Sequence, residues 1–299
     1  MNVELKFSTE VIKDLIEIDV DFYRQNHHDL KSHSVDELYD HYANHGYREG
    51  RICHQSALRE NFIQIENSLK CLEIGPFVNP TLVNNNVKYL DVLSSHDLKK
   101  RAEKIGLQFD SIPNIDFVSK DGSLNIIKEK FDVIFSSHNL EHQPDLISHL
   151  NEAYSTLNPN GVYKMIVPNC YYCFDAYLPP SKISEIILAN YLHVKTHSVA
   201  KVIEHRALTA HNDSLEHWID AINGKREYKK IDVDRVFASM REFEASKGEY
   251  IDVHSWQFMP HTLSDILNSL ISLKFISFKS VKCFGSIYAR NEFCVELHK

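Results

Sequence analysis

Leu69-Lys70-Cys71-Leu72-Glu73-Ile74-Gly75-Pro76 is the stretch of sequence that decides the fold. A short apolar run ends in an acidic residue, and a glycine and a proline follow. This pattern is typical of a buried parallel strand whose carboxyl end opens into a ligand-binding turn. Gly75 can adopt a positive φ and lets the backbone approach a ligand closely. A single glycine is weaker evidence than a full glycine-rich fingerprint, so an ordinary strand and turn is the alternative here.

Strands and helices alternate beyond this stretch. Further strands are predicted at 87–92, 115–118, 131–136 and 162–167, helices at 99–106 and 144–157, and a turn at 158–161. Pro144 is expected in the first turn of its helix. Only residues 77–86 separate the first two strands, so the usual crossover helix must be very short or absent. The alternation predicts an α/β fold with a Rossmann-like, doubly wound parallel sheet.

The last part of the chain interrupts and then completes this sheet. Residues 169–250 are predicted to be helices without strands, which form an insertion after the fifth strand. Thr262 has the spacing of a capping residue and starts a helix that runs through Leu273. Strands at 275–282 and 292–297 follow, and their short connection predicts an antiparallel terminal pair.

Residues 1–68 are predicted to form a helical module. Ser34 and Glu37 form a capping box, and Gly46 is expected to end the helix that follows. The segment His41-Tyr42-Ala43-Asn44-His45-Gly46-Tyr47-Arg48-Glu49-Gly50-Arg51 resembles a small helical module attached to enzymes of bacterial surface-polysaccharide assembly. A plain helical hairpin packed against the next domain is the alternative.

Composition excludes several classes of protein. The 299 residues carry a net charge of −8, which argues against a binder of duplex nucleic acid. No apolar run approaches the roughly 20 residues that span a bilayer, and a secretory signal is not expected. The six cysteines are scattered, which is typical of a reduced, cytoplasmic protein. Cys170 and Cys173 form a lone C-x-x-C without a second pair, so zinc or redox chemistry is not favoured.

An ordered set of motifs resembles the class I S-adenosylmethionine-dependent methyltransferases. The set comprises Glu73-Ile74-Gly75-Pro76, Asp91, Asp121-Gly122, Phe131-Asp132-Val133-Ile134 and Leu157-Asn158-Pro159-Asn160-Gly161. Ser137-His138-Asn139-Leu140-Glu141-His142 and Asp252-Val253-His254-Ser255-Trp256-Gln257-Phe258 resemble two segments of one subgroup. The resemblance covers a core of 69–168 and 251–299, and it implies S-adenosylmethionine as the cofactor.

The resemblance also implies which residues bind the cofactor. They are Glu73, Gly75, Pro76, Phe77, Asn79, Asp91, Asp121, His138 and Leu140. Asp91 ends the second strand, where a carboxylate can accept hydrogen bonds from the cofactor ribose; a turn or N-cap role is its alternative. Phe77 stands where the family has a glycine, so this loop is a variant, and a degenerate domain without activity is an open alternative.

The acceptor site is expected to come from the insertion. His193, His197 and Trp256 are the predicted substrate-binding residues. His193 and His197 are spaced i, i+4 and could share a helix face as metal ligands do, although no metal is predicted. His142 and His254 are the candidate catalytic bases, because a hydroxyl acceptor must lose its proton. A structural hydrogen bond is the alternative for His142.

These observations predict an O-methyltransferase that acts on a sugar of a bacterial surface glycan, such as an O-antigen or capsule, or on its precursor. The expected partner is a glycan, a nucleotide sugar or a lipid-linked acceptor, and the chain could form a homo-oligomer. The competing hypothesis is a non-catalytic domain that binds cofactor or glycan within a biosynthetic complex.

Overall fold

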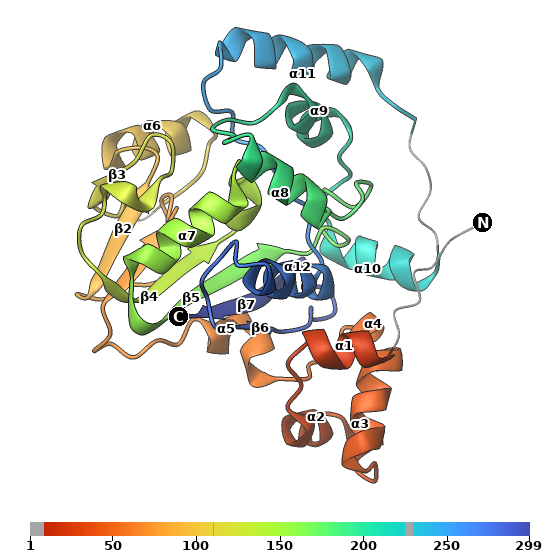
Figure 1. Cartoon of the computed structure of the whole chain (residues 1–299). Helices are drawn as coiled ribbons and strands as arrows, with labels where there is room; N and C mark the ends of the chain where they lie inside the picture. Colours follow the sequence, from red (N-terminus) through yellow and green to blue (C-terminus); the bar gives the residue numbers. More distant parts are fainter. Residues whose placement is uncertain (1–8, 110, 225–229) are drawn as a thin grey trace.

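The computed structural model describes residues 9–109, 111–224 and 230–299 (Figure 1). Within these ranges seven strands form one sheet in the order β3-β2-β1-β4-β5-β7-β6. They are β1 (Cys71–Ile74), β2 (Val87–Asp91), β3 (Phe117–Val118), β4 (Phe131–Ser137), β5 (Leu157–Pro168), β6 (Ser280–Cys283) and β7 (Glu292–His298). The first five are parallel, and β7 is antiparallel to both of its neighbours. The predicted doubly wound sheet with an antiparallel terminal pair is confirmed.

Two strands, β5 and β6, begin five residues from their predicted starts, and β3 is limited to Phe117–Val118. The turn expected at 158–161 is wrong, because β5 already begins at Leu157. Leu157 pairs with Phe131, and the register then shifts before Val162 pairs with Val133. Asn160, at φ +62°, takes up that irregularity. The strand expected at 275–282 is confined to β6, because the backbone N–H of Phe275 still bonds to the end of the preceding helix.

Alternating side chains of the strands enter two different cores. On β4, Ile134 belongs to the larger core, whereas Val133 and Phe135 belong to the smaller one. The smaller core also holds Phe62 of α5 (Arg59–Phe62). The segment between β1 and β2 contains no helix, as predicted. Residues before β1 therefore cover this face of the sheet.

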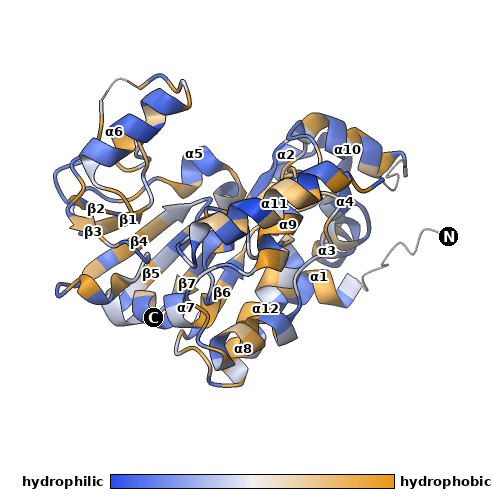
Figure 2. Ribbon diagram, turned by 90° about the horizontal axis from the view of Figure 1, so that it is seen from above, coloured by the Kyte–Doolittle hydropathy of each residue, from blue (hydrophilic) through white to orange (hydrophobic). Residues whose placement is uncertain are grey.

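The face of the sheet that carries the larger core is covered by α7 (Leu146–Thr156) and α12 (Pro260–Ser272). Helix α6 (Ser95–Lys104) lies near the β2–β3 edge (Figure 1). Seen from above, α6 stands apart from the N-terminal helices and is mostly hydrophilic (Figure 2). Three predicted helix starts are wrong, and α6 begins at Ser95 and not at 99, because the Ser94 hydroxyl caps it. Asp145 caps α7 by accepting from the Ser148 N–H, so Pro144 lies before the helix. Met259 precedes α12, and the Thr262 hydroxyl accepts from its backbone N–H.

The N-terminal region is helical in its described part. It contains α1 (Thr9–Leu15), α2 (Val20–Asn26), α3 (Val35–His41), a π-helical turn (Tyr42–Gly46), α4 (Tyr47–Glu49), α5, and short 3-10 turns at His28–Leu30 and Gln55–Ala57. The Ser34–Glu37 capping box is present. Gly46 does not end the helix. The helix continues to Gly50, whose left-handed φ of +66° terminates it.

The N-terminal helices pack onto the last part of the chain. The Glu17 N–H bonds to the Cys283 carbonyl, and the Tyr47 hydroxyl lies 2.6 Å from His261 Nδ1. Gly285 approaches the Tyr42 ring so closely that a Cβ would collide with the hydroxyl. Buried residues of α1 to α3 thus share a hydrophobic core with α12 and β7.

The insertion contains α8 (Ile183–Tyr191), α9 (Val199–Ala207), α10 (Ser214–Ile222) and α11 (Val233–Ser246). The chain enters and leaves it side by side, because Asn169 and Phe258 form a parallel bridge. In Figure 1, α9 and α11 lie at the top of the view and α1 to α3 at the bottom. No helix among the described residues combines the length and apolar character needed to cross a membrane.

Candidate functional site

A cavity of about 270 Å³ lies at the carboxyl ends of β1, β2 and β4. Its walls include Gly75, Phe77, Asp91, Asp121 and His138. This is the edge at which open α/β sheets bind their ligands. Five of the predicted cofactor-binding residues therefore lie around one cavity.

Gly75 and Phe77 shape the floor of this cavity. Gly75 has φ +67°, and a Cβ there would come within 3.2 Å of the Asn139 amide. Phe77 has φ +50°, a conformation that favours glycine. The phenylalanine that replaces the family's glycine therefore keeps a glycine-like backbone.

The two acidic residues of the cavity differ in environment. Asp91 is buried, and its Oδ1 accepts the Leu93 N–H at 3.1 Å. Burial raises the pKa of Asp91, although backbone N–H groups oppose the shift. The pKa of Asp121 is lowered, chiefly because its carboxylate accepts the Ser123 N–H.

The other predicted cofactor-binding residues do not line the cavity. Glu73 is buried, and its two oxygens accept the N–H groups of Thr81 and Leu82 at 2.8 and 2.9 Å. Its carboxylate thus holds the loop that stands in place of the crossover helix. Pro76, Asn79 and the fully buried Leu140 also lie outside the lining.

A second cavity of about 480 Å³ adjoins the first. Four residues line both cavities: Arg101, His138, His142 and Asp252. The second cavity is also lined by Glu141, Phe174, His205, Arg206, Asn212, His254 and Asn291. Two neighbouring cavities with a common wall suit a reaction between two bound molecules.

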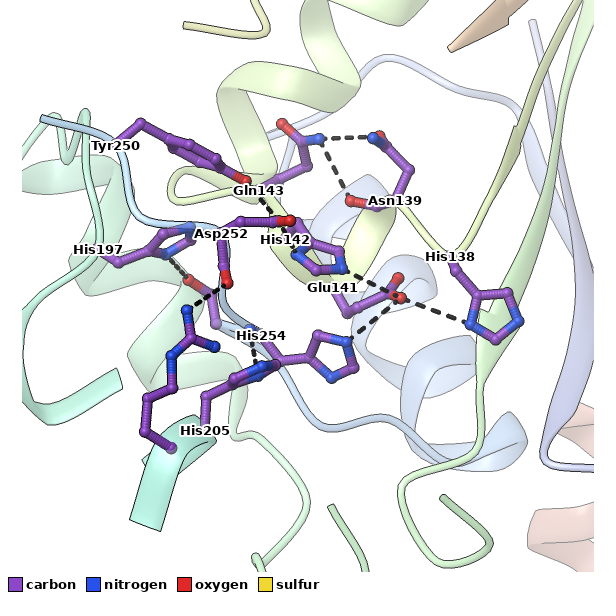
Figure 3. A network of polar contacts seen from close by, with 12 residues as sticks. His138, Asn139, Glu141, His142, Gln143, His197, His205, Tyr250, Asp252 and His254 are labelled. Carbon is purple, nitrogen blue, oxygen red and sulfur yellow. Dashed lines mark hydrogen bonds and ion pairs between the residues drawn. The ribbon is translucent and has the colours of Figure 1, made fainter. Parts of the chain in front are cut away.

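His142 and His254 face each other in the second cavity (Figure 3). Their ring centres lie 4.6 Å apart, although one residue follows β4 and the other follows the insertion. Each ring lies beside a carboxylate. His142 Nδ1 lies 3.0 Å from Asp252 Oδ1, and His254 Nδ1 lies 2.7 Å from Asp175 Oδ2.

Glu141 stands between the histidines (Figure 3). Its side chain is 0% exposed, and neither carboxylate oxygen has a hydrogen-bond partner among the described residues. Glu141 Oε1 lies 3.8 Å from His142 Nε2, 3.8 Å from His254 Nε2 and 3.8 Å from His138 Nδ1. Three imidazoles thus present a nitrogen to one carboxylate oxygen at more than hydrogen-bond distance.

The pKa values of the two facing histidines are shifted in opposite directions. Burial acts to lower the pKa of His142, but the Asp252 and Glu141 carboxylates outweigh it and raise the pKa. Burial lowers the pKa of His254 to about 4, so this ring is neutral at neutral pH. Burial also raises the pKa of Asp175 to about 7.

The predicted substrate-binding residues lie outside both cavities. His193 and His197 follow α8 in a connection and do not share a helix face, so that expectation is wrong. His193 is exposed, whereas His197 is buried against the Ser255 hydroxyl at 2.7 Å. Trp256 donates its indole N–H to the Gln143 carbonyl. The insertion residues that line the second cavity are instead Cys173, Phe174, His205, Arg206 and Asn212.

Sequence analysis did not single out four important residues. Glu141 and Asp252 lie within the quoted motifs but carried no assigned role. Asp175 is 79 positions from the histidine it contacts. Arg101 of α6 bonds to Asp252 at 2.6 Å. For Glu141 the sequence did offer a signal, because it is a charged residue between two histidines of one motif, His138 and His142.

Comparison with protein families identifies part of this architecture. Residues 82–165, which run from the β1–β2 loop into β5, match the family described as "Methyltransferase domain". These residues are therefore similar to a methyltransferase domain. The match implies S-adenosylmethionine as the cofactor, and the strand order is Rossmann-like. No curated protein matches the sequence.

Solved methyltransferase structures resemble this chain distantly. An S-adenosylmethionine-dependent methyltransferase from Thermotoga maritima is 14% identical over 91% of this chain and 98% of its own, with a TM-score of 0.36. One from Mesorhizobium loti is 12% identical over 80% and 94%, with a TM-score of 0.32. The CurJ carbon methyltransferase is 14% identical over 77% and 48%, with a TM-score of 0.35. The chain spans half or less of the first four solved structures it matches.

The first cavity fits the cofactor in chemical terms. Gly75 leaves room for a ligand beside the backbone, and the buried Asp91 carboxylate faces the cavity at the end of β2. Asp121 offers a second acceptor on the same wall. S-adenosylmethionine supplies an electrophilic methyl group on a positively charged sulfur.

Proposed function

We propose that this methyltransferase transfers the methyl group to an oxygen of a sugar, in a bacterial surface glycan or its precursor. The observation that carries the proposal is the common wall of the two cavities, formed by Arg101, His138, His142 and Asp252. Such a wall allows a donor in the first cavity to meet an acceptor in the second. Proximity and orientation of this kind supply most of the rate in a displacement reaction.

The second cavity suits a polyhydroxylated acceptor. Its lining combines amide and guanidinium donors, from Asn212, Asn291 and Arg206, with one aromatic ring from Phe174. Sugars present hydroxyl groups around an apolar ring face, and this lining offers partners for both. The surface-glycan part of the proposal rests on the resemblance of the 41–51 segment.

The histidine pair is proposed to receive the proton of the acceptor hydroxyl. His254 is the better acceptor, because its ring is neutral while the raised pKa of His142 favours the charged form. An ionised Asp175 can only accept, so it holds the His254 proton on Nδ1 and leaves the lone pair on Nε2. That nitrogen lies 3.8 Å from Glu141 Oε1, and His254 lines the second cavity.

A two-stage experiment tests the proposal. Calorimetry with S-adenosylmethionine first measures cofactor binding, and formation of S-adenosylhomocysteine is then measured against a panel of nucleotide sugars and surface glycans. We expect binding and turnover with at least one sugar acceptor. Binding without turnover across the whole panel would instead support the non-catalytic alternative.

A further inference from the structure

We propose that Glu141, His142 and His254 bind a divalent transition-metal ion between the two cavities. One ligand atom from each residue lies within 4.8 Å of the other two. The three side chains come from a 3-10 turn after β4 (Leu140–His142) and from the segment that precedes α12. Two imidazoles and one carboxylate form a donor set of catalytic metal sites.

The spacing leaves room for an ion. Glu141 Oε1 lies 3.8 Å from both His142 Nε2 and His254 Nε2, which is too far for a hydrogen bond. Ligand atoms about 2.0–2.2 Å from a tetrahedral ion lie about 3.4 Å from one another. A contraction of a few tenths of an ångström would therefore bring Glu141 Oε1 to the ligand spacing expected with each histidine nitrogen.

The surroundings of the two histidines match those of metal ligands. A ligating histidine usually donates its other ring nitrogen to a carboxylate, which fixes the tautomer and orients the ring. Asp252 lies at the Nδ1 of His142, and Asp175 lies at the Nδ1 of His254. Both Nε2 atoms thus point towards the same carboxylate oxygen.

Glu141 supplies an independent observation. Its carboxylate is fully buried, and both oxygens lack a hydrogen-bond partner among the described residues. A buried charge without a donor is costly, and a cation would offset that cost. The backbone carbonyl of Glu141 is occupied, because it accepts the Ser255 N–H at 2.7 Å. The carbonyl therefore cannot supply the missing partner, and both side-chain oxygens lack a hydrogen-bond donor among the described residues.

The role of the ion, but not its binding, rests on the proposed function. A bound cation acts as a Lewis acid and lowers the pKa of a hydroxyl that contacts it. The acceptor hydroxyl would lose its proton to water, and its oxygen would take the methyl group as the carbon–sulfur bond breaks. The bonding electron pair goes to the sulfur, which becomes neutral. No oxidant or reductant is required.

Metal binding can be measured without cofactor or acceptor. The full chain is stripped with a chelator and titrated with Zn²⁺, Mn²⁺ and Co²⁺, and Co²⁺ also reports its ligands through visible absorption. We expect one ion per chain and a rise in melting temperature. Glu141→Gln and His254→Ala should each weaken binding by at least about 100-fold, and Asp175→Asn by about 10–100-fold.

Two controls keep the test sharp. His193→Gln removes an exposed histidine and should leave metal affinity unchanged. Glu141→Gln removes the buried charge in nearly the same shape, so the metal-free variant should melt at a higher temperature than the metal-free parent. A protein with no measurable binding of the three ions, or with binding unaffected by Glu141→Gln and His254→Ala, would overturn the inference. Metal binding without any methyl transfer would contradict the proposed function but not the metal site.

Discussion

Asp91→Asn should weaken S-adenosylmethionine binding without unfolding the protein. The Asp91 carboxylate is buried at the end of β2, and Oδ1 already accepts the Leu93 N–H. An asparagine can keep that bond with its single oxygen, but it then presents an NH₂ group where the cofactor hydroxyls need an acceptor. Losing a charged acceptor costs about 1–3 kcal/mol, which raises Kd by about 5–150-fold.

Isothermal calorimetry on folded protein measures this change, and Glu73→Gln is the paired variant. Glu73 lies on the neighbouring strand, but its carboxylate accepts the N–H groups of Thr81 and Leu82. A glutamine there sets an N–H group against another N–H group and should cost about 1–3 kcal/mol of folding stability. Its cofactor affinity should change far less than that of Asp91→Asn.

The pH dependence of cofactor binding distinguishes the effect of the Asp91 charge from the effect of the side chain's shape. Because burial raises the pKa of Asp91, protonation competes with binding at a higher pH than for an exposed carboxyl group. Wild-type affinity should fall as the pH falls towards that pKa, and the affinity of Asp91→Asn should lack this part of the pH dependence. Equal affinities of wild type and Asp91→Asn at neutral pH would refute the assignment of Asp91 to the cofactor site.

Three further outcomes are expected. His254→Ala should lower kcat by about 10²–10⁴-fold with little change in cofactor Kd, as measured by coproduct assay and calorimetry. Burial lowers the pKa of His149 in the folded protein to about 4, so the unfolded chain binds the proton more readily. Stability should thus fall by up to about 3 kcal/mol between pH 6.5 and 4, and His149→Gln should remove that part while the exposed His96→Gln should not. Gly285→Ala should destabilise the protein by about 1–3 kcal/mol in denaturant unfolding through its clash with the Tyr42 hydroxyl, and adding Tyr42→Phe should restore part of the loss.

The sequence predicted the sheet well because a buried parallel strand has a strong local pattern. Val133, Ile134 and Phe135 form an unbroken apolar run in the middle of β4. Helix ends were harder to predict than strands, because several residues near a helix end can act as the cap. Thr262 was expected to precede its helix, yet its hydroxyl acts from the first turn on the Met259 N–H. Gly46 was expected to end its helix, but a π-helical turn continues the helix past Gly46, and Gly50 ends it.

The site was predicted less completely, because burial and long-range pairing decide it. His142 and His254 were paired from their positions after β4 and after the insertion, and the structure brings their rings together. The burial of Glu141 cannot be read from the letters around it. Asp175 lies in a stretch of turns before α8, and only the packing of the insertion brings it to His254.

The two roles given to the histidine pair predict different responses to a chelator. If His254 accepts the proton by itself, its Nε2 must face the acceptor hydroxyl, and stripping metal should leave kcat unchanged. If an ion binds between Glu141 and the histidines, the same lone pair is used in coordination, and kcat should fall on stripping and return with added metal. The geometry favours the second role, because a base alone does not require a buried, unpartnered carboxylate 3.8 Å from it.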